Sequence, residues 1–123
     1  MTHDAHIAIV GAGIGGLTAA LCFRHLGYRV DVFEQSPELK EVGAGIQISP
    51  NGLRVFEKLG LDQRLKEDGL QARAIQLMNH APSRAVARLD LAKSRAEGGY
   101  YLFHRADLLT VLVDACSGAG VPI

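Results

Sequence analysis

The hydrophobic pattern at the start of the chain predicts a strand, a helix and a second strand. Residues 6–10 form a short apolar run, rich in β-branched side chains and bounded by Gly11, which is typical of a strand buried on both faces in a parallel sheet. Over residues 15–26 apolar side chains recur at helical spacing, and Gly27 supplies the C-terminal stop. Residues 28–33 form the second strand. Such a βαβ unit requires parallel strands joined by a right-handed crossover.

Extended and helical patterns then alternate along the chain. Residues 42–48 form an irregular stretch, and Ser49 and Pro50 after it favour a helix start with a capping hydroxyl and a proline in the first turn. This helix should end at Gly60, and a further short helix is expected over residues 61–68.

The second half of the chain predicts a hairpin and a final helix. Residues 74–79 and 85–91 are typical of two hairpin strands. A polar link over residues 93–99 leads to Tyr100, Tyr101 and Phe103, which are expected on a strand that lines the core or a cleft. A last helix is expected from about residue 107 to 116. The sequence therefore predicts an α/β fold: a Rossmann-like βαβ unit with a parallel sheet, and a small antiparallel hairpin.

The predicted sheet is incomplete. The chain ends at Ile123, where the alternation of helix and strand calls for another parallel strand. Two strands with apolar side chains on both faces also lack the neighbours that would cover them. We therefore expect a fragment or truncated product of a larger protein.

Charge and composition narrow the class of protein. The 13 Lys and Arg residues balance 13 Asp and Glu residues, and 48% of residues are hydrophobic, as in an ordinary soluble domain. The chain has no basic run for nucleic acid or an anionic membrane, no apolar stretch near the ~20 residues that span a bilayer, and no signal-peptide pattern. We expect a cytoplasmic protein that binds neither nucleic acid nor membrane. Cys22 and Cys116 are expected as small hydrophobic residues without a disulfide.

Three glycines between the first strand and the first helix carry the chemistry. Gly11, Gly13 and Gly16 have the spacing G-x-G-x-x-G. Gly11 permits a tight turn, Gly13 leaves room for a pyrophosphate against bare backbone, and Gly16 lets helix and strand pack closely. The free N–H groups and the positive end of the helix dipole would face the phosphates. The spacing alone is weak evidence, but its place between strand and helix favours dinucleotide binding.

An acidic residue, Glu34, ends the second predicted strand. Its carboxylate can accept hydrogen bonds from both hydroxyls of an adenosine ribose and would repel a 2′-phosphate, which disfavours NADP at this site. The alternative is a solvated glutamate at a strand end. The pentapeptide of residues 10–14 recurs at residues 42–46, but Ile48 stands where a third glycine would have to be, so the second copy is no second fingerprint. It forms either a turn that brings backbone close to a flat ligand or a plain loop.

Four ordered segments resemble the N-terminal part of FAD-dependent aromatic-ring monooxygenases of the salicylate hydroxylase type. They are residues 11–16, VFEQ at 32–35, VGAGIQISPN at 42–51 with LGL at 59–61, and HRADL at 104–108. The resemblance extends from Ile7 to about Val121. It implies that residues 1–123 are the N-terminal portion of an FAD-binding domain, without the remainder of that domain and the substrate domain, and inactive alone.

The resemblance also implies an activity. In such flavoenzymes NAD(P)H reduces bound FAD, and molecular oxygen then hydroxylates a phenolic or other aromatic acid through a flavin hydroperoxide. Two alternatives stay open for this chain. One is another FAD-dependent oxidoreductase, such as an epoxidase or alkene reductase. The other is a catalytically silent nucleotide-binding or interaction module left by truncation.

Cofactor contacts follow from the resemblance by matching position. Gly15 and the neighbouring backbone would lie at the pyrophosphate and Glu34 at the ribose. Arg105 would lie near the phosphate and ribose region of FAD, where its guanidinium suits phosphate oxygens. Arg105 could instead pair with Asp107, which is expected to cap the last helix. The complete set of expected cofactor-binding residues is Gly11, Gly13, Ile14, Gly15, Gly16, Glu34, Gln35, Gln47 and Arg105.

No catalytic or metal-binding residue is predicted. Gln47 falls in the flavin-facing turn, where some relatives carry a histidine credited with proton transfer. Glutamine cannot titrate, so we expect Gln47 to be near the cofactor without a catalytic role, or to be an ordinary loop residue. His3 and His6 lack the further ligands that a metal ion would need.

Overall fold

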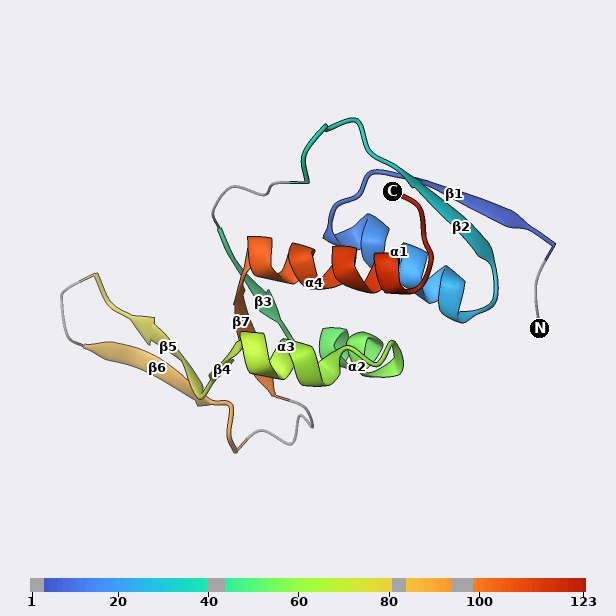
Figure 1. The fold of residues 1–123 in the computed structure, drawn as a ribbon. Coiled ribbons are helices and arrows are strands. Elements are labelled where there is room, and N and C mark those ends of the chain that lie inside the picture. The colour runs from blue at the N-terminus through green and yellow to red at the C-terminus, as the bar shows by residue number, and fades with distance from the viewer. Residues whose placement is uncertain (1–3, 40–43, 81–83, 94–98) are drawn as a thin grey trace.

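The computed structural model describes residues 4–39, 44–80, 84–93 and 99–123 (Figure 1). Its elements are β1 (His6–Val10), α1 (Ile14–His25), β2 (Arg29–Phe33), β3 (Gly45–Ile48), α2 (Pro50–Lys58), α3 (Asp62–Asp68), β4 (Leu70–Ala72), β5 (Ala74–Met78), β6 (Ala85–Asp90), β7 (Tyr100–His104) and α4 (Arg105–Gly118). The strands form a parallel pair, a three-stranded antiparallel sheet and a hairpin. The predicted α/β class is confirmed.

The first βαβ unit forms as its hydrophobic pattern predicts. β1 and β2 pair in parallel, with Ile9 opposite Val32. The Gly11 N–H extends this ladder by donating to the Phe33 carbonyl oxygen at 2.7 Å. α1 packs on one face of the pair and buries Leu17 completely. The carboxyl ends of both strands therefore lie beside the N-terminus of α1, where ligands of parallel α/β folds bind.

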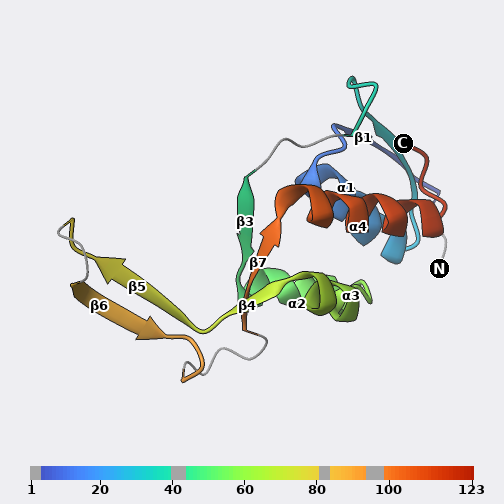
Figure 2. The same ribbon diagram turned by 60° about the vertical axis from the view of Figure 1, so that its left-hand side comes forward.

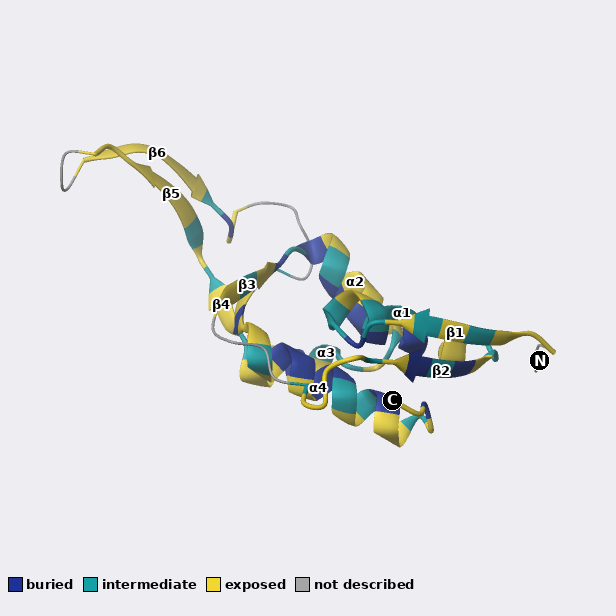
Figure 3. Cartoon of the chain, turned by 90° about the horizontal axis from the view of Figure 1, so that it is seen from above, coloured by how far each residue is buried: buried dark blue, intermediate teal, exposed yellow. Residues whose placement is uncertain are grey.

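Burial of the parallel strands differs from the prediction. Val30 and Val32 are buried, but Val10 is 89% exposed and Phe33 is 58% exposed. Successive strand residues point to opposite faces, and only the face toward α1 is covered in the described part of the chain (Figure 3). The prediction of burial on both faces is therefore wrong here. At the other edge of β2, the Val32 N–H donates to the Pro122 carbonyl oxygen at 2.9 Å.

β7 is the central strand of the antiparallel sheet β3–β7–β4, and Ile46 of β3 lies opposite Phe103 of β7. The interpretation of residues 42–48 as irregular is wrong for β3, because β7 supplies hydrogen-bond partners from far along the sequence. β4 was not predicted. Val42 and Gly43, which begin the second pentapeptide, lie outside the described residues.

Two predicted helix caps differ in detail. Ser49 stands at the N-cap of α2, but its hydroxyl donates to the Asn51 side chain, and it makes no capping bond to the helix backbone. α4 begins earlier than predicted, at Arg105, with His104 at the N-cap position. Asp107 lies within the first turn, so its prediction as the cap is wrong, although a carboxylate there still favours the helix dipole.

α1 and α4 pack together at the centre of the core. The Cys116 thiol of α4 lies 3.7 Å from the Leu17 carbonyl oxygen of α1, and both Cys22 and Cys116 are free thiols. The largest fully buried side chains come from α1 to α4 and are Leu17, Leu53, Leu65, Leu108, Leu112, Val111 and Cys116. Among the described helices, none is long and apolar enough to cross a membrane.

The predicted hairpin is confirmed and projects away from the helices (Figures 1 and 2). β5 and β6 are antiparallel, and Ile75 lies opposite Leu89 with both side chains about half exposed. Residues 81–83 of its turn lie outside the described part.

Candidate functional site

The glycine-rich turn has the backbone geometry that each glycine was expected to provide. Gly11 has φ of +99°, a conformation that side chains rarely tolerate, and it turns the chain from β1 toward α1. At Gly16 a β-carbon would stand 1.9 Å from the Gly11 carbonyl oxygen, so only glycine fits there. No heavy atom lies within 4 Å of the corresponding position at Gly13 or Gly15. The outer surface of the turn is therefore bare backbone.

The N-terminus of α1 offers free hydrogen-bond donors. Gly13 is the N-cap residue and has no side chain to cap the helix, and the first turn holds no acidic residue. The first intrahelical bond is donated by the Leu17 N–H to the Gly13 carbonyl oxygen at 2.9 Å. The N–H groups of Ile14, Gly15 and Gly16 precede that bond and, with the helix dipole, favour an anion.

Glu34 joins this turn to the segment that follows β2. Its Oε2 accepts a hydrogen bond from the Ala12 N–H at 2.7 Å, and its Oε1 accepts one from the Ser36 N–H at 2.9 Å. These bonds, from Ala12 first and Ser36 second, lower the pKa of the Glu34 carboxyl below its ordinary value. Glu34 is therefore ionised at neutral pH. It lies beside the glycine turn, as its position at the end of the second strand predicted.

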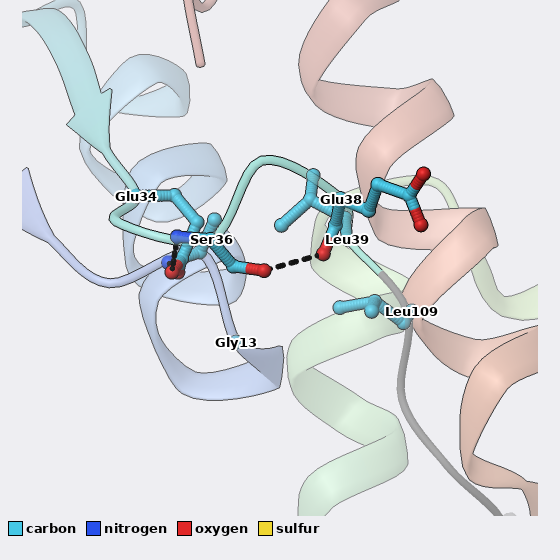
Figure 4. A pocket seen from close by; sticks show the side chains of 7 residues that line it. Gly13, Glu34, Ser36, Glu38, Leu39 and Leu109 are labelled. Carbon is cyan, nitrogen blue, oxygen red and sulfur yellow. Dashed lines mark hydrogen bonds between the residues drawn. The ribbon is translucent and has the colours of Figure 1, made fainter.

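The turn and Glu34 border a pocket of about 140 Å³ (Figure 4). Its described lining residues are Ala12, Gly13, Glu34, Ser36, Glu38, Leu39 and Leu109. Glu34 and Ser36 lie on the side of α1, with Leu39 and Leu109 across from them. The volume is below the roughly 300–1,000 Å³ of a whole ligand site, so it suits one part of a dinucleotide, such as a sugar with a phosphate beside it.

The acidic lining of the pocket suits a ribose and disfavours a second phosphate on it. The charged side chains among the described lining residues are the carboxylates of Glu34 and Glu38. A ribose diol can donate to the Glu34 carboxylate, whereas a 2′-phosphate would meet its negative charge. The bare glycine backbone and the free helix N–H groups stand next to this acidic side and suit a diphosphate. The residues present therefore fit the adenosine diphosphate half of a dinucleotide.

Arg105 lies close to the same pocket. It is the first residue of α4, and Leu109, one helical turn further on, lines the pocket. The Arg105 N–H donates to the Ala44 carbonyl oxygen at 3.1 Å, which fixes the start of α4 against the segment before β3. The Arg105 side chain is exposed.

Gln47 lies apart from the glycine turn. It is an exposed residue of β3 and lines a second pocket of about 190 Å³, where the antiparallel sheet meets the base of the hairpin. The other described lining residues are Ala72, Ala74, Ile75, Leu91, Tyr100 and Leu102, so the walls are mainly apolar and Gln47 and Tyr100 supply the polar groups. The two pockets share no described lining residue.

The structure thus groups the expected residues unevenly. Gly13 and Glu34 line the first pocket, whereas Gln35 follows Glu34 as an exposed residue and Ile14 is half-buried at the start of α1. The sequence reasoning missed Ala12, Ser36, Glu38, Leu39 and Leu109. Leu109 lies one helical turn after Arg105, but the packing of α4 decides which of its faces borders the pocket. Ala12 contributes its backbone N–H, and its side chain gives no such signal.

Metal binding has no support in the described residues. No three His, Cys, Asp or Glu side chains within them are arranged to hold a metal ion. The His6 imidazole pairs with the Asp31 carboxylate at 2.9 Å, and His3 lies outside the described residues.

Comparison with known proteins identifies the family. The family described as FAD binding domain matches residues 4–123. Over 98% of its length, the chain is 44% identical to 3-amino-4-hydroxybenzoate 2-monooxygenase of Streptomyces cremeus, of which it covers 32%. It is 38% identical over 94% of its length to 3-hydroxybenzoate 6-hydroxylase 1 of Aquipseudomonas alcaligenes, of which it covers 30%.

A solved structure gives the same relationship. The tetrameric form of 2-methyl-3-hydroxypyridine-5-carboxylic acid oxygenase superposes with a TM-score of 0.84 at 29% identity. The match covers 96% of this chain and 30% of that one. The chain therefore spans about a third of the length of these relatives.

Proposed function

Since the chain belongs to the FAD binding domain family, we propose that it forms the part of an FAD-dependent aromatic-acid monooxygenase that holds the adenosine diphosphate half of the cofactor. Residues 1–123 would then be the N-terminal portion of that protein's FAD-binding domain. The relatives that are 44% and 38% identical are named as a monooxygenase and a hydroxylase of hydroxybenzoates. Their names support an aromatic carboxylate as the substrate class.

One observation carries the proposal: Glu34 and Gly13, the uncapped N-cap residue of α1, line the same pocket, and the Glu34 carboxylate is bonded to the Ala12 N–H between them. The N–H groups of Ile14, Gly15 and Gly16 would bind the diphosphate. Glu34 would accept hydrogen bonds from the ribose hydroxyls. Arg105, one turn from the pocket wall, would approach the phosphates from the start of α4.

FAD would supply the redox chemistry, because it can take two electrons from a nicotinamide nucleotide and pass them to oxygen for insertion into an aromatic ring. The described residues contribute binding and orientation. Gln47 and Tyr100 could orient an aromatic acid through hydrogen bonds, while the apolar walls around them would keep water from its ring. Gln47 holds no titratable proton, so its part is orientation.

The test uses purified protein that carries this chain at the length of its relatives. We expect it to show the visible absorption of bound flavin and to consume NAD(P)H faster when a hydroxybenzoate is present. A folded protein that cannot be reconstituted with FAD would contradict the proposal. NAD(P)H consumption that no aromatic acid alters would favour a different FAD-dependent oxidoreductase. The cytoplasmic location stays a prediction.

A further inference from the structure

We propose that Glu34 is a positioning residue for the glycine turn as well as a ribose ligand. Its carboxylate fixes the peptide between Gly11 and Ala12 before any nucleotide arrives. This inference rests on the proposed function, because it assigns a second task to the same site. It predicts that losing Glu34 weakens binding even of a nucleotide that has no ribose hydroxyls.

The geometry places one carboxylate across two segments of the chain. Oε2 accepts from the Ala12 N–H at 2.7 Å, and Oε1 accepts from the Ser36 N–H at 2.9 Å. Both distances are in the range of charge-assisted hydrogen bonds, which are stronger than neutral ones. The Ser36 hydroxyl in turn donates to the Glu38 carbonyl oxygen at 2.8 Å. Glu34 therefore ties the turn before α1 to the segment that forms the opposite wall of the pocket.

The turn has few other restraints on its outer side. Positions where β-carbons would stand at Gly11, Gly13 and Gly15 have no heavy atom within 4 Å. On the inner side, Gly11 donates to the Phe33 carbonyl oxygen and the Ala12 methyl group is buried. Glycine-rich backbone loses more conformational freedom on ordering than other backbone. A strong hydrogen bond at Ala12 orders the turn in advance, which lowers the entropy cost of nucleotide binding.

The Ala12 N–H also needs a partner of its own. Ala12 is 1% exposed, and a buried N–H that loses its acceptor is costly. Without the carboxylate, the peptide would have to turn toward water, and the turn would lose the conformation that presents its backbone to a diphosphate. The effect of Glu34 thereby reaches the diphosphate site, which the side chain does not itself touch.

The carboxylate keeps capacity for the ribose. An ionised carboxylate offers about four acceptor positions, and the bonds from Ala12 and Ser36 take two of them. Hydrogen bonds from a ribose diol can therefore add to the existing pair. The two roles of Glu34 can be measured separately. A nucleotide without the ribose diol cannot bond to Glu34 through it, so any change in its affinity reflects the glycine turn.

The experiment compares ADP with 2′,3′-dideoxy-ADP, which lacks both ribose hydroxyls. Dissociation constants are measured by calorimetry on the flavin-free full chain for wild type, Glu34→Ala and Glu34→Gln. We expect wild type to bind ADP more tightly than dideoxy-ADP. Glu34→Ala should weaken dideoxy-ADP by about tenfold and ADP by more. Glu34→Gln retains one acceptor oxygen and should fall between wild type and Glu34→Ala.

Glu38→Gln is the matched control, because it removes the same charge from the same pocket. It should affect dideoxy-ADP less than Glu34→Gln does, and an equal effect would overturn the inference. Amide hydrogen exchange gives a second readout that needs no ligand. In Glu34→Ala the Ala12 and Ser36 amides should exchange faster, while the Leu17 amide within α1 should keep its protection and report that the variant is folded.

The two proposals fail in different ways. If Glu34→Ala binds dideoxy-ADP as tightly as wild type does, Glu34 acts through the ribose alone and the positioning role is wrong. Unchanged exchange of the Ala12 amide would have the same meaning. If wild type binds neither nucleotide, the proposed function fails, and the positioning role fails with it.

Discussion

The carbonyl oxygen of Gly11 lies 1.9 Å from the point where a β-carbon on Gly16 would stand. The first turn of α1 thus touches the backbone of the turn that precedes it. The Gly11 backbone cannot easily shift away from α1, because its N–H donates a hydrogen bond to the Phe33 carbonyl oxygen. This contact fixes the N-terminus of α1 against the end of β1. It thereby also fixes the N–H groups that would bind a diphosphate.

Replacement of Gly16 by alanine should lower the free energy of unfolding by about 1–3 kcal/mol, because the methyl group forces the helix away from the turn. Urea unfolding measures the change. Gly15→Ala is the matched control: its β-carbon would meet no heavy atom within 4 Å, and alanine is the better helix former. Equal unfolding midpoints for the two variants would contradict the steric account.

The pH dependence of stability should report on Glu34. Its pKa is lowered in the folded protein by the hydrogen bonds from Ala12 and Ser36. The carboxylate therefore stabilises the fold fully above the ordinary glutamate pKa, and that contribution disappears as pH falls through the lowered pKa. The difference in unfolding free energy between wild type and Glu34→Gln should shrink over this acidic range. A difference that stays constant between neutral and acidic pH would show that the carboxylate charge is not responsible.

Loss of the Arg105 guanidinium should weaken FAD binding. We expect Arg105→Ala to raise the FAD dissociation constant by about tenfold, because a charged donor to phosphate is lost. Arg105→Lys should restore part of the affinity, since it keeps the charge without the planar fork. Flavin fluorescence titration measures both variants. Arg54→Ala, at an exposed position of α2, is the control, and an effect as large as that of Arg105→Ala would point to a general charge effect.

Replacement of Gln47 by leucine should weaken binding of the aromatic acid without changing the affinity for FAD. FAD affinity should stay unchanged, because the pocket lined by Gln47 shares no described residue with the pocket at Glu34. The KM for the stimulating aromatic acid should rise by about tenfold as a hydrogen bond is lost. Gln76→Leu, at an exposed position of hairpin strand β5 outside that pocket, should change neither value. Loss of FAD from Gln47→Leu alone would instead place Gln47 at the cofactor.

The part of the fold that was predictable is the part set by local pattern. The strands around α1, the hairpin, and α2, which ends before Gly60, follow from hydrophobic period and glycine placement. The three glycines of the fingerprint each have the geometry expected of them because their demands are steric and close in sequence. Glu34 reaches the same turn because parallel strands end at one edge.

The rest depended on partners distant in sequence. β3 and β4 are short, and each becomes a strand by pairing with β7, so no local pattern marks them. The pocket wall formed by Leu109 arises from how α4 packs against α1, which periodicity alone does not specify. The link from Glu34 to Ala12 uses a backbone N–H, and the side chain of Ala12 carries no sign of it.

The contact between Leu17 of α1 and Cys116 of α4 has a consequence for the pocket at the glycine turn. α1 begins at the glycine turn and α4 carries Leu109, so the opposing sides of the crevice are mounted on one tightly packed helix pair. Its width is consequently dictated by the size of interior side chains. Methyl-scale changes deep in the protein should thus retune nucleotide affinity without altering a single group that touches the nucleotide.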